Sequence, residues 1–337
     1  MNMNTYHFTA PTRLDFAGGP TDIEPFRSTE GGHVVNASLS VSAHASVAPR
    51  EDSDITIISS DLGIEEHYPS INEMDIDGPL RLIKAAIHRV GPEQGLTVTT
   101  QNEAPHGSGL GASGSLAIAL LNGLRHVKGE APSSQQLVAD ALYVENVMLD
   151  NINGGQDQYA AAMGGFRSFS FSGDEVETRA LDIHPDTVQE LEDRSVLCFS
   201  GESHFSGKVL DQIIQEYLNG EVRTVTALRD MKSIAMDIGE ALLSGELDEF
   251  GVLLQRAGRR QSEYHPAITP SEVVAIKNLA FSKGATGSKM AGAGGGGCVY
   301  FFCEPGRKEH VESSLLNRGV QVLPIHFTST GVHAQIN

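Results

Sequence analysis

The chain has no tryptophan and only three cysteines in 337 residues. Cys198, Cys298 and Cys303 are too sparse for a disulfide framework and lack the spacing of metal ligands. Each cysteine lies in an apolar, strand-like run, which predicts buried thiols that stay reduced. The N-terminus has no basic region followed by an apolar one, as a secretion signal would require. We therefore expect a cytoplasmic protein.

Basic residues are scarce as well. Lys and Arg number 24 against 43 Asp and Glu, which gives a formal net charge of −19 at pH 7. Because nucleic-acid backbones need basic surfaces and the sequence has no Lys/Arg cluster, we expect no nucleic-acid partner. Long apolar runs are missing too, so no membrane partner is expected. Apolar residues still make up 40% of the chain, enough for the core of a globular protein.

The hydrophobic pattern divides the chain into an early part rich in strands and a later part rich in helices. Alternation predicts strands at residues 6–16, 33–49, 54–59 and 95–100, and helical periodicity predicts helices at 79–90, 112–127 and 134–150. Strands follow at 166–172 and 195–200, helices dominate 206–282, and strand, helix and strand end the chain at 297–303, 305–317 and 320–327. This order favours two α+β lobes over one doubly wound sheet.

Glycine, in contrast, is abundant, and its most informative cluster is the run from Pro105 to Ser113. Alternating glycines leave backbone N–H groups uncovered, and the predicted helix behind them has a partially positive N-terminus. Together these features predict a site for a multiply charged anion, a nucleotide phosphate above all. The residues expected to bind it are Pro105, Gly107, Ser108, Gly109, Leu110, Gly111, Ala112 and Ser113.

Two other phosphate-binding motifs fit less well. A Walker A loop is absent: at Gly207-Lys208, Glu202 stands where the first glycine belongs. Gly107, Gly109 and Ala112 satisfy the G-x-G-x-x-A fingerprint of a dinucleotide-binding fold. However, these glycines do not follow a strand at once, and no strand ending in an acidic residue comes about twenty residues later. A glycine-rich helix start without a ligand is the remaining alternative.

Two further glycine segments accompany the first. A strand places Arg13 and Asp15 on one side, turns at Gly18-Gly19-Pro20, and sets Asp22 where its carboxylate can accept hydrogen bonds from hydroxyls. Taken alone, this segment fits a hairpin with exposed charges equally well. Near the other end, residues 292–297 contain five glycines in six positions. So many glycines indicate close backbone approach, although a tight turn is the alternative.

Two carboxylates complete the candidate site. Glu145 falls on the apolar face of the predicted helix at 134–150, where a carboxylate is costly unless it meets a cation or a metal. Asp157 lies at a junction between a loop and a helix, a position that an ordinary N-cap aspartate would also take.

The segments Arg13–Asp22, Pro105–Ser115 and Lys289–Gly297 resemble, in order and approximate spacing, the three signature motifs of the GHMP small-molecule kinases. Glu145 and Asp157, twelve residues apart, resemble the magnesium-ligand glutamate and catalytic aspartate of galactokinase. Within the family, Phe16–Asp22 and the run around Asp157 most resemble the bacterial D-glycero-D-manno-heptose 7-phosphate kinases. The resemblance covers nearly the whole chain.

The resemblance implies a two-lobed α+β GHMP kinase fold. Its N-terminal α/β lobe, with the glycine-rich phosphate loop, would span residues 1–180. Its C-terminal ferredoxin-like α+β lobe would span residues 181–337. The implied activity is ATP-dependent phosphorylation of a sugar hydroxyl, at the anomeric position of D-glycero-D-manno-heptose 7-phosphate.

The resemblance also implies roles for individual residues, with ATP and Mg²⁺ as cofactors. Asp157 and Arg13 would be catalytic, and Glu145 with Ser113 would hold the metal. The family loop usually has a serine at the position of Ala112, so its role is vacant or passes to Ser113 or Ser115. The implied substrate-binding residues are Asp22, Gly18, Gly19, Lys208, Gly294 and Gly295.

Several alternatives stay open. Lys208, Arg259 and Arg260 are candidates to bind the phosphate of the heptose. Lys208 is equally explained as a solvated lysine, and Arg259-Arg260 is better explained as a solvated helix face. A neutral galactose-, fucose- or arabinose-like sugar would need no such cation. A non-catalytic ligand binder with this fold is favoured only by Ala112, and a nucleotide-dependent decarboxylase is a third possibility. The sequence does not decide between a monomer and a homodimer.

Overall fold

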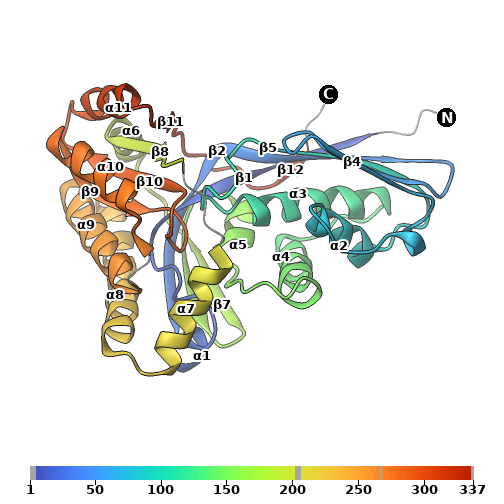
Figure 1. The fold of residues 1–337 in the computed structure, drawn as a ribbon, viewed down its shortest axis with the longest axis horizontal. Helices are drawn as coiled ribbons and strands as arrows, with labels where there is room; N and C mark the ends of the chain where they lie inside the picture. The colour runs from blue at the N-terminus through green and yellow to red at the C-terminus, as the bar shows by residue number, and fades with distance from the viewer. Residues whose placement is uncertain (1–4, 202–205, 266–267, 335–337) are drawn as a thin grey trace.

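The computed structural model describes residues 5–201, 206–265 and 268–334. For residues 206–208 it describes the backbone only. It contains a large sheet built mainly from the first half of the chain and a small sheet built from the second (Figure 1). No helix in the described ranges has both the length and the apolar character needed to cross a membrane.

The large sheet has eight strands, most of them antiparallel. Six follow the order β12-β1-β2-β5-β3-β4, while β6 pairs with β2 and with β7. The strands are β1 (Tyr6–Ala17), β2 (Gly32–Pro49), β3 (Ile55–Ser59), β4 (Ile64–Tyr68), β5 (Leu96–Asn102), β6 (Phe166–Ser172), β7 (Glu175–Ala180) and β12 (His333–Ala334). The five strands predicted at 6–16, 33–49, 54–59, 95–100 and 166–172 are present, and β4, β7 and β12 are additional.

Helices cover one face of the large sheet (Figure 1). They are α2 (Arg81–Val90), α3 (Ala112–Val127), α4 (Ser134–Leu142) and α5 (Gln156–Met163). The predicted helices at 79–90 and 112–127 are confirmed. The predicted helix at 134–150 is only partly correct, because its α-helical part ends at Leu142 and a π-helical turn, η2 (Tyr143–Met148), follows. Two short helices, α1 (Phe26–Thr29) and η1 (Ile71–Glu73), lie in connections.

The small sheet has the order β11-β8-β10-β9, and every pair in it is antiparallel. Its strands are β8 (Ser195–Phe199), β9 (Ala285–Met290), β10 (Cys298–Cys303) and β11 (Gln321–Leu323). In chain order this is a 4-1-3-2 arrangement, as predicted for a ferredoxin-like lobe. The helices are α6 (Pro185–Asp193), α7 (Ser206–Leu218), α8 (Val222–Ser244), α9 (Leu247–Glu263), α10 (Ser271–Ser282) and α11 (Lys308–Asn317).

The two sheets share one core. Phe16 of β1 meets Phe250 of α9 edge to face at 5.3 Å between ring centroids, and Tyr300 of β10 at 5.8 Å. A second core lies between the large sheet and α2, α3 and α4, and contains residues such as Leu120. The proposed division after residue 180 separates strands β1–β7 from β8–β11. However, β12 lies after that division and pairs with β1 in the large sheet, and the first core contains residues of both lobes.

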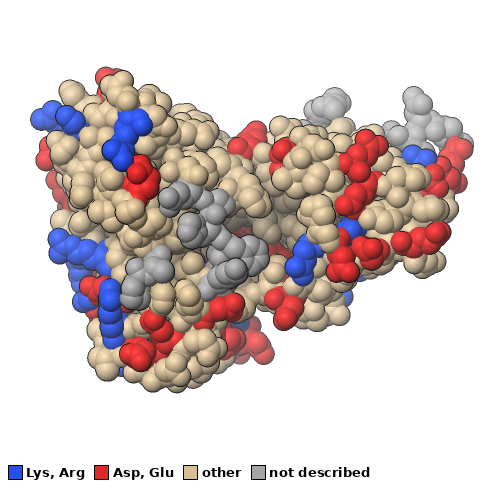
Figure 2. All heavy atoms as spheres, viewed as in Figure 1, with Lys and Arg blue, Asp and Glu red and all other residues tan. Residues whose placement is uncertain are grey.

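The surface agrees with the acidic composition. In Figure 2 acidic side chains gather along the lower edge and on the end of the molecule that carries α2 and α4, and basic ones mainly along the margin formed by the C-terminal helices. The same view shows a recess between these helices and the end of the molecule that carries α2 and α4.

The three thiols provide a test of the fold. All three are free and fully buried, and burial raises the pKa of Cys198 and Cys303 to about 12 and that of Cys298 further still. Since the thiolate is the reactive form, we expect native protein at pH 8 to take up no iodoacetamide, as measured by mass spectrometry. Protein unfolded in guanidinium should take up one group on each cysteine. Rapid labelling of the native protein would contradict this core.

Candidate functional site

The phosphate loop lies between β5 and α3. Gly107, Gly109 and Gly111 have φ angles of 69°, 76° and 74°, which L side chains rarely adopt. Gly111 is the N-cap of α3, and no side chain caps this helix. Because the helix start lacks a side-chain acceptor, its N–H groups and positive dipole end are available to an anion. The predicted phosphate site therefore has the required local geometry.

The C-terminal glycine segment, residues 292–297, packs against this loop together with Ala291. The backbone N–H of Cys298 donates to the carbonyl of Ser108 at 2.8 Å. A Cβ on Gly109 would lie 2.5 Å from the carbonyl oxygen of Ala291, and one on Gly297 would lie 2.7 Å from that of Gly107. Only glycine permits this approach. The predicted close contact of the segment is therefore confirmed, and one partner is the backbone of the phosphate loop.

The predicted substrate contacts of Gly294 and Gly295 stay predictions. A Cβ on Gly294 would lie 2.7 Å from Cγ2 of Ile268. The N–H of Gly295 donates to the carbonyl of Ile268 at 2.7 Å. In this structure both glycines therefore contact the connection before α10.

Arg13 and Asp157 form an ion pair beside the phosphate loop. Arg13 Nε and Nη2 lie 2.8 Å and 2.6 Å from Asp157 Oδ1, and Arg13 Nη1 donates to the carbonyl of Gly109 at 2.5 Å. Gly155 is the N-cap of α5, so Asp157 is not a capping aspartate. A Cβ on Gly111 would lie 3.0 Å from Asp157 Cγ. The small residue lets the carboxylate sit directly against the loop.

Glu145 is a buried carboxylate that forms no ion pair with any Lys or Arg side chain in the described part of the chain. It is 3% exposed and lies on the π-helical turn, a distortion often found at functional sites. Gln158 Nε2 donates to Oε1 at 2.6 Å, and Asn153 Nδ2 and Ser113 Oγ donate to Oε2 at 3.2 Å and 3.3 Å. Burial above all, and then the charge of Asp157, raises the pKa of Glu145 to about 7. A cation at this carboxylate would relieve the cost of its burial.

Two neighbouring hydroxyls are the candidates for the role of the serine that is missing at Ala112. Ser113 is exposed in the first turn of α3 and contacts Glu145. Ser115 is buried, and its Oγ donates to the carbonyls of Pro11 at 2.7 Å and Gly111 at 3.1 Å. Of the two alternatives, only Ser113 faces the candidate metal position.

Asp22 is the second buried carboxylate near Asp157. It is 3% exposed and accepts two long hydrogen bonds from Gln156, at 3.4 Å from the backbone N and 3.5 Å from Nε2. Its carboxylate touches the backbone at Gly154, where a Cβ would clash. Burial chiefly, followed by the charges of Asp157 and Asp15, raises the pKa of Asp22 to about 7.

Several residues of the site were not given a role by sequence reasoning. Gln156, Gln158 and Asn153 bind the two carboxylates, yet their only sequence signal was their place next to Asp157. Lys289 is fully buried and forms an ion pair with Asp15, with Nζ 2.8 Å from Oδ2. A lysine beside a glycine run carries no signal of such a distant partner.

The three basic residues predicted to bind the phosphate of the heptose lie in different surroundings. The side chain of Lys208 lies outside the described residues. Arg260 is bound to Asp230 at 2.6 Å and to Glu263 at 2.5 Å, so its charge is largely compensated, while Arg259 is exposed on α9.

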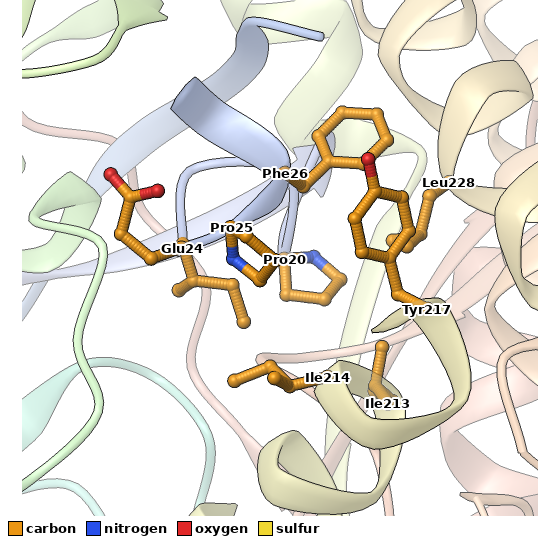
Figure 3. A pocket seen from close by; sticks show the side chains of 9 residues that line it. Pro20, Glu24, Pro25, Phe26, Ile213, Ile214, Tyr217 and Leu228 are labelled. Atoms are coloured by element: carbon orange, nitrogen blue, oxygen red, sulfur yellow. The ribbon is translucent and has the colours of Figure 1, made fainter. Parts of the chain in front are cut away.

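An apolar pocket lies behind the turn that carries Asp22 (Figure 3). Pro20, Ile23, Pro25 and Phe26 of the turn face Ile213, Ile214 and Tyr217 of α7 and Leu228 of α8. Glu24 is the charged member of its lining. An apolar pocket with an acidic rim does not suit a phosphate.

The raised pKa of Asp22 has a consequence for stability. The folded protein holds this proton more tightly than the unfolded chain, whose aspartate has a pKa of 3.8. Ionisation of Asp22 therefore lowers the free energy of unfolding. This loss is complete above pH 7 and disappears as the pH falls to about 4. We expect Asp22→Asn to melt at least about 3 °C higher than the parent at pH 8, and the gain to vanish near pH 4.

The matched control is Asp140→Asn. Asp140 accepts hydrogen bonds from Arg89 and Arg125, so this variant should be less stable than the parent. Thermal unfolding followed by circular dichroism measures both variants. Equal melting temperatures of Asp22→Asn and the parent at pH 8 would contradict the assigned burial.

Comparison with known proteins agrees with this geometry. The model of the GHMP kinases N terminal domain matches residues 79–165, and that of the GHMP kinases C terminal matches residues 238–321. A D-glycero-alpha-D-manno-heptose 7-phosphate kinase of Campylobacter jejuni is 28% identical over 98% of both chains. A crystal structure titled as a D-glycero-D-manno-heptose 1-phosphate kinase from Bacteroides thetaiotaomicron is 28% identical, has a TM-score of 0.82, and is matched over 98% of this chain and 99% of that one.

A bifunctional L-fucokinase/L-fucose-1-P guanylyltransferase of Bacteroides fragilis is 29% identical over 88% of this chain. The match covers only 34% of that protein. Both family models match in chain order, and the alignments with the heptose kinases run over almost the whole length. The chain belongs to the GHMP kinase family.

Proposed function

We propose that this GHMP kinase transfers the γ-phosphoryl group of ATP to the anomeric hydroxyl of a heptose that already carries a phosphate at its 7-position. The observation that carries the kinase assignment is the Arg13–Asp157 pair, which lies against the phosphate loop through the carbonyl of Gly109. It supports a reaction in which a hydroxyl is activated within reach of a bound nucleotide phosphate.

In this mechanism Asp157 is the proton acceptor. Arg13 binds Oδ1, so Oδ2 is left to accept the proton of the attacking hydroxyl. The sugar oxygen then forms its bond to the γ-phosphorus while the bond from that phosphorus to the oxygen of ADP breaks. Arg13 stabilises the charge that develops on the transferred group, and the loop amides hold the phosphates. No covalent intermediate with the protein is needed.

Glu145 and Ser113 suit Mg²⁺. Both offer oxygen atoms, Glu145 has no other cation among the described residues, and Mg²⁺ commonly takes only one or two protein ligands beside substrate phosphates. When bound, the metal supplies positive charge that neutralises the phosphates of the nucleotide. Gln158 and Asn153 would keep Glu145 oriented through their hydrogen bonds.

The proposed acceptor binds at the turn that carries Asp22. Asp22 would bind sugar hydroxyls. The substrate contacts of Gly18 and Gly19 stay predictions, because both glycines pack against the protein itself: a Cβ on Gly18 would lie 2.1 Å from the carbonyl oxygen of His33, and one on Gly19 would lie 2.7 Å from Asp15 Oδ2. The names of two similar proteins, both heptose phosphate kinases, support a phosphorylated heptose. A neutral sugar is the second candidate. Arg260 is already paired within the protein, and the fucokinase relative is 29% identical to this chain, about as similar as the heptose kinases.

The acceptor is tested by release of ADP from Mg-ATP with a panel of sugars. The panel should include D-glycero-D-manno-heptose 7-phosphate, the unphosphorylated heptose, mannose, galactose, fucose and arabinose. Turnover confined to the phosphorylated heptose supports the proposal, and turnover on a free sugar refutes the 7-phosphate requirement. Absence of turnover on every sugar would refute the sugar kinase assignment.

The role of Asp157 predicts a large effect on turnover. Replacement by Asn keeps the size and removes the proton acceptor, so kcat should fall by roughly 10²- to 10⁴-fold while ATP still binds. Steady-state kinetics and calorimetric titration with ATP measure the two quantities. Turnover within a few-fold of the parent would exclude the role of Asp157 as a base.

The two serines of α3 provide a matched pair. Ser113→Ala removes a proposed metal contact, so the Mg²⁺ concentration for half-maximal activity should rise by roughly 10-fold. Ser115→Ala removes hydrogen bonds within the protein and should lower the melting temperature without changing the Mg²⁺ dependence. The reverse pattern would place the metal ligand at Ser115.

A further inference from the structure

Lys289 and Asp15 form a fully buried ion pair that the proposed mechanism does not use. The ammonium is 0% exposed and Asp15 is 1% exposed, and Lys289 Nζ lies 2.8 Å from Asp15 Oδ2. Nζ also donates to the carbonyl of Asp15 at 3.1 Å and to that of Met290 at 3.4 Å. The three acceptors satisfy the three N–H groups of an ammonium. In the described part of the chain, neither residue hydrogen-bonds to Asp157, Glu145 or Ser113.

The pair joins two elements that are remote in the sequence. Asp15 belongs to β1 in the large sheet and Lys289 belongs to β9 in the small sheet. Asp15 is two residues from Arg13 and therefore lies on the same face of β1. Gly19 lies against it, since a Cβ there would be 2.7 Å from Asp15 Oδ2 and 2.8 Å from Gln156 Nε2. One end of the pair thus meets the turn that leads to Asp22.

The other end of the pair leads into the phosphate loop. Lys289 is followed almost at once by Ala291 and Gly292, whose backbone packs on Gly109. Gln261 of α9 supports the same backbone, because its Nε2 donates to the carbonyl of Gly292 at 2.9 Å. Moving Lys289 relative to Asp15 would therefore move the phosphate loop relative to the turn.

Stability alone is a poor reason for such a pair. Removing two charges from water costs about as much as their attraction returns, and apolar replacements of buried pairs are often neutral or stabilising. The best attested use of a buried polar pair is to fix the register between packed elements. Here the elements held in register carry the proposed nucleotide site and the proposed acceptor site.

We infer that Lys289 and Asp15 are positioning residues, which hold Arg13 and the turn from Gly18 to Asp22 at the correct distance from the phosphate loop. The kinetic part of this inference rests on the proposed function. A misplacement of reacting groups by about 1 Å can lower turnover by roughly 100-fold. The pair would thus act on the rate without touching a substrate.

The test compares Lys289→Met and the uncharged double variant Asp15→Asn/Lys289→Met with a control, Lys84→Met. Lys84 is also a buried ammonium, 3% exposed, with Glu66 at 3.2 Å and Asp75 at 3.1 Å. It lies on α2 at the opposite end of the molecule from β9 (Figure 1). kcat and both KM values should be measured well below each melting temperature, per folded enzyme.

We expect both Lys289 variants to lose kcat by roughly 10- to 100-fold and to bind ATP within about threefold of the parent. Lys84→Met should have a lower melting temperature than the parent but the same kcat. If Lys289→Met does not fold, the double variant carries the test, because it leaves no uncompensated charge in the core. Unchanged kcat in a folded Lys289 variant overturns the inference.

A second readout does not depend on turnover. Backbone hydrogen exchange of peptides covering residues 14–22 and 105–111 should speed up at least about tenfold in the double variant and stay as in the parent for Lys84→Met. Unchanged exchange in both peptides overturns the inference, whatever the sugar. Faster exchange combined with a parent that phosphorylates no sugar would sustain the coupling of the two segments and reject only the proposed function.

Discussion

The site depends on the position of Arg13. Its backbone N–H donates to the carbonyl of Leu110 at 2.9 Å, its Nη1 donates to the carbonyl of Gly109, and its Nε and Nη2 bind Asp157. One buried residue therefore ties β1 to the phosphate loop and to α5. Because a buried guanidinium that loses its partners is costly, none of these elements can shift without a penalty of several kcal/mol. The geometry between nucleotide site and proton acceptor follows from this constraint.

The side chains around Arg13 carry more negative than positive charge. Four carboxylates, Asp15, Asp22, Glu145 and Asp157, gather there, while Arg13 and Lys289 are the cations bound to them in the described part of the chain. Burial above all, and then the surplus negative charge, raises the pKa of Asp22 and of Glu145 to about 7. A site of this kind gains from ligands that bring hydroxyl donors or a metal cation, and both are what a sugar kinase binds.

Much of this arrangement could be predicted, because the residue types are restrictive. Alternating glycines before an apolar helix fit few purposes other than binding an anion, and that helix begins at Ala112 as expected. The strands β4 and β7 were missed for a physical reason: both are edge strands with mostly polar residues, so pairing rather than burial defines them. The π-helical turn at Glu145 was missed because apolar periodicity does not reveal one extra residue per turn.

By itself the sequence determined most of the strands and helices, their division into a strand-rich and a helix-rich part, the glycine segments and the candidate residues Arg13, Glu145 and Asp157. It could not determine partners, because contacts such as Arg13 to Asp157 and Lys289 to Asp15 join residues 144 and 274 positions apart. Those contacts exist only once the sheets have packed through a common core. Tertiary structure alone decided that Ser113 and not Ser115 faces Glu145, since the two hydroxyls lie on different sides of one helical turn and only packing shows which side is filled.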